Sequence, residues 1–203
     1  MNYKEILYEH RGRAAWIYLN RPKAMNTITT VMALELENAL TKAESDSNVR
    51  SLILSGKGQA FCAGADLKVF LATMNETEKL GPDFLDHVTV AMNHLRQFTK
   101  PVIVALNGLA LAGGLELIMC CDIVFAVESA KLGDVHSNFG VFPGAGGAAV
   151  LPRMPHPRSR AKRPGGSVAG GRPVDNWGQT PLINPTSCSA LSSCSQRCST
   201  VPV

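Results

Sequence analysis

The sequence lacks any long apolar run and contains few aromatic residues. Of its 203 residues 6% are aromatic, and no stretch approaches the roughly 20 apolar residues that a membrane-spanning helix needs. The first residues, MNYKEILYEHRGR, are charged and lack the apolar segment of a secretory signal. These absences argue against a membrane protein, and we expect a cytoplasmic protein with no membrane partner.

Paired cysteines are also missing. The six cysteines include no C-x-x-C spacing, so neither a zinc ribbon nor a disulfide framework is indicated. Cys62 stands alone and Cys120 and Cys121 are adjacent, which is typical of buried thiols, while the other three lie near the C-terminus. We therefore expect no metal site.

Acidic residues are scarce only in the last part of the chain. Residues 1–154 hold 14 basic and 15 acidic residues, whereas residues 155–203 hold 6 basic residues and 1 acidic residue. The net charge of +4 therefore comes from residues 155–203 and does not indicate a basic surface on the rest of the chain. We expect no nucleic-acid partner. Residues 155–203 also hold 7 of the 12 prolines and show no helical or strand period. We expect one domain over 1–154 and a disordered, Pro/Gly/Ser-rich tail over 155–203.

Within residues 1–154, strand and helix patterns alternate, which favours an α/β layered fold. Thr27 is expected to cap the first helix, which ends near Asp46. Residues 74–82 are expected to form a loop and residues 133–142 an irregular segment. The expected strands are Ile6–Tyr8, Ala14–Asn20, Ser51–Ser55, a short one from Ala60, Pro101–Leu106, Leu109–Leu111 and Ile123–Val127; further helices are expected after Gly64, near Gly114, at Phe84–Phe98 and from Gly144.

The stretch PVIVALNGLALAGGLELIMCCD, residues 101–122, joins a buried strand, an Asn-Gly turn, two glycines and a helix start. The first N–H groups of a helix have no partner within it, and the missing Cβ at Gly113-Gly114 opens the backbone to a ligand oxygen. Glu116 follows, so its carboxylate is expected in the same pocket. Gly64-Ala65 repeats the bend upstream, and the two bends together predict two N–H donors.

Two phosphate-binding alternatives fail on their context. Neither glycine bend carries the Lys-Ser/Thr of a P-loop. Residues 144–149, GAGGAA, fit G-x-G-x-x-A, but they follow Phe142-Pro143 rather than a strand, and no acidic residue lies about twenty positions on. A dinucleotide site is therefore excluded.

Four motifs in order resemble the crotonase family, the enoyl-CoA hydratase/isomerase superfamily. They are NRPKAMN at 20–26, AFCAGADL at 60–67, PVIVALNGLALAGGLEL at 101–117 and FGVFPGAGGAAVLPR at 139–153. The resemblance implies a spiral of ββα units that binds acyl-CoA thioesters and assembles as trimers or hexamers. The family's usual C-terminal helical region cannot be recognised in the sequence after residue 154.

Our hypothesis for this change is a shift of the reading frame near codon 154. The hypothesis is wrong if neither of the other two frames of the coding DNA continues the family pattern.

The resemblance also implies roles for particular residues. Ala65 and Gly113 match the backbone donors of an oxyanion hole, and Glu116 matches the first of two catalytic glutamates, although a purely structural carboxylate is the alternative. No separate cofactor is expected, because coenzyme A is part of the substrate. The segments that hold CoA in relatives correspond to Ala24, Met25, Ala63, Gly64, Asp66, Leu67 and Lys68, where Lys68 either meets a phosphate or is simply a solvated helix lysine.

The second catalytic glutamate is replaced in this chain. Counted back from Pro143-Gly144, its position falls on His136 in GDVHSNFG. A histidine of near-neutral pKa still serves as acid or base, so Glu116 with His136 is the expected pair. A histidine making an ordinary polar contact in a loop is the alternative, and Asp134 is a weaker substitute for the missing carboxylate.

The function expected from the resemblance is hydration of a 2-enoyl-CoA, with an acyl-CoA thioester as the partner. Isomerisation of the double bond or hydrolysis of the thioester would use the same oxyanion hole. A second kind of function remains open, an inactive fragment or binding module, because the C-terminal cover is not recognisable.

Overall fold

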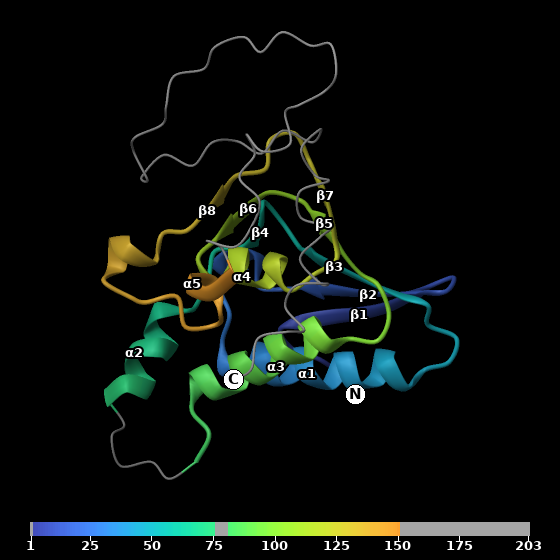
Figure 1. The fold of residues 1–203 in the computed structure, drawn as a ribbon, viewed down its shortest axis with the longest axis horizontal. Coiled ribbons are helices and arrows are strands. Elements are labelled where there is room, and N and C mark those ends of the chain that lie inside the picture. Colours follow the sequence, from blue (N-terminus) through green and yellow to red (C-terminus); the bar gives the residue numbers. More distant parts are fainter. Residues whose placement is uncertain (1, 76–80, 151–203) are drawn as a thin grey trace, which may run out of the picture.

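The computed structural model describes residues 2–75 and 81–150 and shows two β-sheets with helices packed against them (Figure 1). The α/β fold expected from the sequence is confirmed. The predicted disorder of residues 155–203 lies outside the described residues.

The larger sheet has five strands, in the spatial order β1-β2-β3-β5-β7. The first pair is the predicted hairpin and is antiparallel, and every other neighbouring pair is parallel. Its strands are β1 (Ile6–Arg11), β2 (Ala14–Leu19), β3 (Ser51–Gly56), β5 (Val102–Leu106) and β7 (Ile123–Ala126).

The smaller sheet is parallel, with the order β4-β6-β8. Its strands are β4 (Ala60–Cys62), β6 (Leu109–Leu111) and β8 (Leu132–Gly133). Along the chain, β4 follows β3, β6 follows β5 and β8 follows β7, so each consecutive pair of strands adds one strand to each sheet. Because β4, β6 and β8 are parallel, the segments that leave them emerge at one edge.

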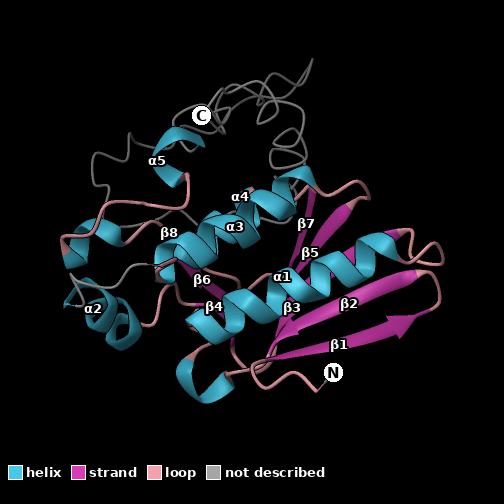
Figure 2. Cartoon of the chain, turned by 90° about the horizontal axis from the view of Figure 1, so that it is seen from below, coloured by secondary structure: helices cyan, strands magenta, loops and turns pink. Residues whose placement is uncertain are grey.

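Two long helices, α1 and α3, run across one face of the larger sheet (Figure 2). Their apolar residues supply much of the core, including Met32, Leu40, Met92 and Leu95. The helical elements are α1 (Thr30–Ser45), α2 (Leu67–Asn75), α3 (Phe84–Gln97), α4 (Gly113–Met119), α5 (Gly147–Val150) and the 3-10 turns η1 (Pro22–Ala24) and η2 (His136–Phe139).

The cap of the first helix differs from the prediction. Thr29, not Thr27, is the N-cap, and its hydroxyl accepts a hydrogen bond from Met32 N at 3.0 Å. The Thr27 hydroxyl instead accepts one from Arg21. The helix gives way to the extended residue Asp46, as predicted.

Two local predictions need correction. Residues 133–142 are not wholly irregular, because they include the last residue of β8 and all of η2. Helix α2 continues to Asn75, where a loop was expected from residue 74. Strand β8 and the turn η2 have two and four residues, too few to show a clear period.

The three cysteines expected to be buried are buried, at Cys62, Cys120 and Cys121. Burial raises the pKa of the Cys62 thiol to about 12, which makes it a poor nucleophile. None of the helices in residues 2–75 and 81–150 has the length and apolar character to cross a bilayer.

Candidate active site

The predicted site residues leave the three strands of the smaller sheet at its common edge. The Gly64-Ala65 bend follows β4, α4 follows β6, and Asp134 and His136 follow β8. Segments about fifty and about twenty residues apart in sequence are thereby brought to one place, which the sequence pattern alone does not reveal.

The two predicted oxyanion donors are neighbours. A Cβ added at Gly113 would lie 3.7 Å from the Ala65 nitrogen, and one added at Gly64 would lie 3.4 Å from the Gly113 nitrogen. The Ala65 segment is fixed by a bridge to Ile28, whose N–H donates to the Gly64 carbonyl at 2.8 Å. Within the described residues, neither the Ala65 nor the Gly113 N–H donates a hydrogen bond, so both are available to a ligand oxygen.

The backbone around these donors adopts uncommon conformations. Gly64 has φ +99°, which glycine tolerates, but Ala112 has φ +47° and ψ −118°, which alanine rarely adopts. Such a residue costs of order 1–3 kcal/mol, and it persists where its surroundings hold it. Here Ala112 N donates to the Gly133 carbonyl at 2.9 Å, and its own carbonyl accepts from Glu116 N at 3.0 Å. The strain orients the peptide that carries the Gly113 N–H.

Glu116 lies in the first turn of α4 and is only 3% exposed. Its Oε1 accepts hydrogen bonds from Ala145 N at 3.0 Å and Gly147 N at 2.7 Å. A buried carboxylate needs such partners, and these two occupy one oxygen. The other, Oε2, lies 3.4 Å from His136 Nε2.

The predicted partnership of Glu116 and His136 is therefore present as a contact. The His136 side chain is 12% exposed, and its Nδ1 lies 2.6 Å from Asp134 Oδ1. Asp134 contacts the Nδ1 side of the imidazole ring, on the opposite side from Glu116. The three side chains form a row, Glu116–His136–Asp134.

Several residues assigned to CoA binding lie beside the donor bend. Ala63 N donates to the Met25 carbonyl at 3.0 Å, which holds the segment containing Ala24 next to residues 63–65. Met25 is 52% exposed and Leu67 is 41% exposed. Lys68 is also exposed, so a ligand can reach it.

Asp66, also assigned to the CoA-binding segment, makes hydrogen bonds within the protein. Its carboxylate accepts from Arg21 Nη2 at 3.1 Å and from Lys68 N at 3.2 Å. Burial opposes ionisation of Asp66, but these hydrogen bonds outweigh it and hold the pKa of its carboxyl below the usual range. Its side chain is therefore engaged within the protein and stabilises the bend at Gly64.

Two polar residues that support this region, the buried Asn26 and the half-buried Arg96, were not singled out from the sequence. Asn26 is fully buried, accepts from Arg21 N and donates to the Lys57 and Ala60 carbonyls. Arg96 of α3 donates to the Ala145 carbonyl, on the loop whose N–H groups hold Glu116. The NRPKAMN motif was a signal for Asn26, whereas nothing in the helical pattern distinguished Arg96.

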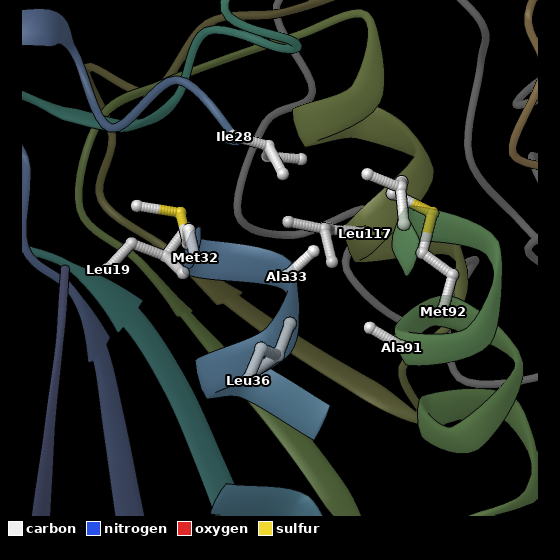
Figure 3. A pocket seen from close by; sticks show the side chains of 9 residues that line it. Leu19, Ile28, Met32, Ala33, Leu36, Ala91, Met92 and Leu117 are labelled. Carbon is white, nitrogen blue, oxygen red and sulfur yellow. The ribbon is translucent and has the colours of Figure 1, made fainter. Parts of the chain in front are cut away.

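A narrow apolar pocket lies between α1, α3 and α4 (Figure 3). In Figure 3, Met32, Ala33 and Leu36 of α1 lie on one side and Ala91 and Met92 of α3 on the other, with Leu117 of α4 between the two helices. Its lining is apolar throughout and includes none of the predicted site residues. The pocket therefore contains no group that can move a proton.

A sequence model described as "Enoyl-CoA hydratase/isomerase" matches residues 9–163 of the chain. The chain belongs to the enoyl-CoA hydratase/isomerase family. It is 40% identical over 157 residues to a protein of Rhizobium meliloti named "Probable enoyl-CoA hydratase", covering 75% of this chain and 58% of the relative. It is 39% identical over 158 residues to a "Crotonyl-CoA hydratase" of Syntrophomonas wolfei, covering 77% and 60%.

Solved structures of the enoyl-CoA hydratase/isomerase family share the fold. An enoyl-CoA hydratase from Bacillus anthracis superposes with a TM-score of 0.67 at 36% identity, covering 74% of this chain and 58% of that one. An enoyl-CoA hydratase from Polaromonas sp. JS666 gives 0.70 at 28% identity, covering 74% and 59%. The crotonase-like fold is thus confirmed, and the chain spans 58–60% of the length of the two curated relatives named above.

Proposed function

We propose that the chain carries the active site of a 2-enoyl-CoA hydratase, which adds water across the double bond of an acyl-CoA thioester. One observation carries the proposal: two N–H groups without partners in the described structure lie next to each other, and the helix that begins at one of them bears Glu116 in contact with His136. The names of the curated relatives support the same reaction class.

The proposed chemistry follows from the charge that develops during the reaction. Addition of water to a 2-enoyl thioester passes through an enolate, whose negative charge sits on the thioester oxygen. The N–H groups of Ala65 and Gly113 would donate to that oxygen, and removing one such donor typically costs roughly 3–4 kcal/mol of transition-state stabilisation. Glu116 and His136 would supply the base and the acid.

The remaining assignments belong to the same proposal. The backbone around Ala24, Met25 and residues 63–68 would hold the CoA moiety, and Lys68 would meet a phosphate. No separate cofactor is needed, because the CoA arrives with the substrate. A place in fatty acid metabolism, a cytoplasmic location and trimeric assembly extend the proposal, and size-exclusion chromatography with light scattering tests the assembly.

The test is hydration of short- and medium-chain 2-enoyl-CoA by the purified chain and by its Glu116→Gln variant. General acid–base groups contribute about 10²–10⁴-fold, so the variant should lose at least a hundredfold in kcat while its Kd for an acyl-CoA stays near that of the parent. Glu128→Gln, which alters an exposed residue after β7, is the matched control and should retain full turnover. Undiminished turnover by Glu116→Gln would show that the carboxylate is structural.

A module that binds an acyl-CoA without converting it is the second candidate. It predicts measurable acyl-CoA binding by the unmodified chain with no hydration, isomerisation or hydrolysis of any enoyl-CoA tested. Turnover by the unmodified chain would exclude it.

A further inference from the structure

His136 lies between two carboxylates, one at each ring nitrogen. Nδ1 is 2.6 Å from Asp134 Oδ1, and Nε2 is 3.4 Å from Glu116 Oε2. Asp134 Oδ1 also accepts the backbone N–H of His136 at 3.2 Å, so the carboxylate is anchored to the residue whose ring it orients. The second contact is longer than an ordinary N–H···O hydrogen bond, which leaves the Nε2 side less tightly held than the Nδ1 side.

These contacts constrain the protons that the row can hold. A ring nitrogen facing a carboxylate oxygen is favourable only if one of the two carries a proton. If both contacts are to be favourable they need two protons, and with Asp134 as the acceptor at Nδ1 the first of these lies on the ring. The remaining proton lies on His136 Nε2 or on Glu116 Oε2. Both forms have a net charge of −1 and differ only in the position of that proton.

We propose that Asp134 is a positioning residue that makes His136 a proton donor, and that the Glu116–His136 contact returns a proton to the donor after each turnover. This inference rests on the proposed hydration. The Asp134 carboxylate would hold Nδ1–H, direct Nε2 toward Glu116 and offset the charge of the imidazolium. When protonated, the Asp134–His136 pair has no net charge, like a carboxylic acid. The pair can therefore take the role of a second catalytic carboxyl group.

The reaction balances with one water and no other reactant. Glu116 Oε2 takes a proton from water while the water oxygen bonds to C3, and the electron pair of the C2=C3 double bond moves to form the enolate. His136 Nε2–H then transfers its proton to C2, and the enolate electrons form the C2–H bond. This leaves Glu116 protonated and His136 neutral, and transfer of the proton from Oε2 to Nε2 restores the starting state.

Other charged groups near the row do not replace Asp134. Among the described residues, the ion pairs of His136 are with Asp134 and Glu116. Arg96 donates to the Ala145 carbonyl, on the loop that hydrogen bonds to the other oxygen of Glu116. The Asp134 side chain is 34% exposed, so its replacement removes charge without opening a cavity in the core.

The test compares Asp134→Asn and Asp134→Glu with the unmodified chain, using kcat/KM for a 2-enoyl-CoA as a function of pH. Deprotonation of His136 removes the donor, so it sets the alkaline limb of the profile. Loss of a neighbouring negative charge disfavours the imidazolium, so the limb should move to lower pH in Asp134→Asn. The conservative Asp134→Glu should return it toward the original position, while Glu128→Gln should leave it unmoved.

A second readout separates this inference from the proposed function. The chain has five histidines, and His136→Gln identifies the His136 ring signals in ¹⁵N NMR spectra. The ring should lose its second proton at lower pH in Asp134→Asn than in the unmodified chain, whether or not the protein turns over substrate. If the unmodified chain hydrates nothing, the proposed function and the proton-return step are both refuted. If the ring and the pH profile titrate alike in both proteins, the role of Asp134 is refuted while the hydratase proposal stands.

Discussion

Replacing Gly114 with alanine would place a methyl group 2.1 Å from the carbonyl oxygen of Cys62 and 2.9 Å from its carbonyl carbon. Even weakly attractive C–H···O contacts keep carbon and oxygen about 3.3 Å apart, so the overlap is about 1 Å. The obstructing atoms belong to the backbone of β4, and no side-chain rotation relieves the clash. Helix α4 must therefore move away from the smaller sheet.

The expected cost of this displacement is at the upper end of the range for overpacking, roughly 3 kcal/mol of unfolding free energy. For an ordered core of about 150 residues, that corresponds to a fall in Tm of about 6–12 °C. Because α4 begins with the Gly113 donor and carries Glu116, turnover should fall as well.

The adjacent Gly113 provides a matched comparison. A methyl group there would lie 3.6 Å from Gly64 Cα and from Ile28 Cδ1, which are ordinary contact distances, and its φ is not in the positive range. Gly113→Ala should therefore stay within about 1 kcal/mol of the parent in stability. The methyl would also lie 3.7 Å from the Ala65 nitrogen, beside the other donor, and should reduce kcat by about tenfold or more.

Urea unfolding followed by circular dichroism measures the stability of both variants, and the enoyl-CoA assay measures turnover. The reasoning is refuted if Gly114→Ala is as stable as the parent, or if Gly113→Ala unfolds as easily as Gly114→Ala.

Three further predictions concern other parts of the chain. Gly146→Ala combines a φ of +102° with a Cβ 2.6 Å from the Arg96 guanidinium, so it should lower kcat with a smaller loss of stability than Gly114→Ala; equal stability and kcat to the parent would contradict this. The backbone N–H of Thr99 holds the pKa of Glu44 below its usual value of 4.5 despite partial burial. The ionised Glu44 therefore stabilises the fold above pH 4.5 and loses this effect as pH falls through its lowered pKa. The stability difference between Glu44→Gln and the parent should shrink below pH 4.5 in urea titrations, and a constant difference would refute this assignment. Cys62, whose pKa burial raises to about 12, should resist iodoacetamide at pH 8 in the folded protein and react once it is unfolded, as mass spectrometry of the peptide can show.

Local sequence signals predicted most of the secondary structure. Helices α1 and α3 show a clear helical period, and strands β3 and β5 are continuous apolar runs. These patterns are distinctive, and all four elements lie close to their expected bounds. The signals were weakest where elements are short. Strand β8 has two residues and η2 has four, too few to show a period. The helix cap was misplaced because Thr27 and Thr29 are equally plausible from sequence, and Arg21 takes the hydroxyl of Thr27.

For the site, the sequence by itself determined the kinds of group present: two glycine bends with open backbone, one carboxylate at Glu116 and a histidine where a second carboxylate was expected. The tertiary structure alone decided how they meet. Parallel pairing of β4, β6 and β8 brings Ala65, Gly113 and His136 to one edge, because strands of the same direction end on the same side. It also decided that Asp134 contacts the far nitrogen of His136, a relation that depends on the turn after β8 and on no repeating pattern in the chain.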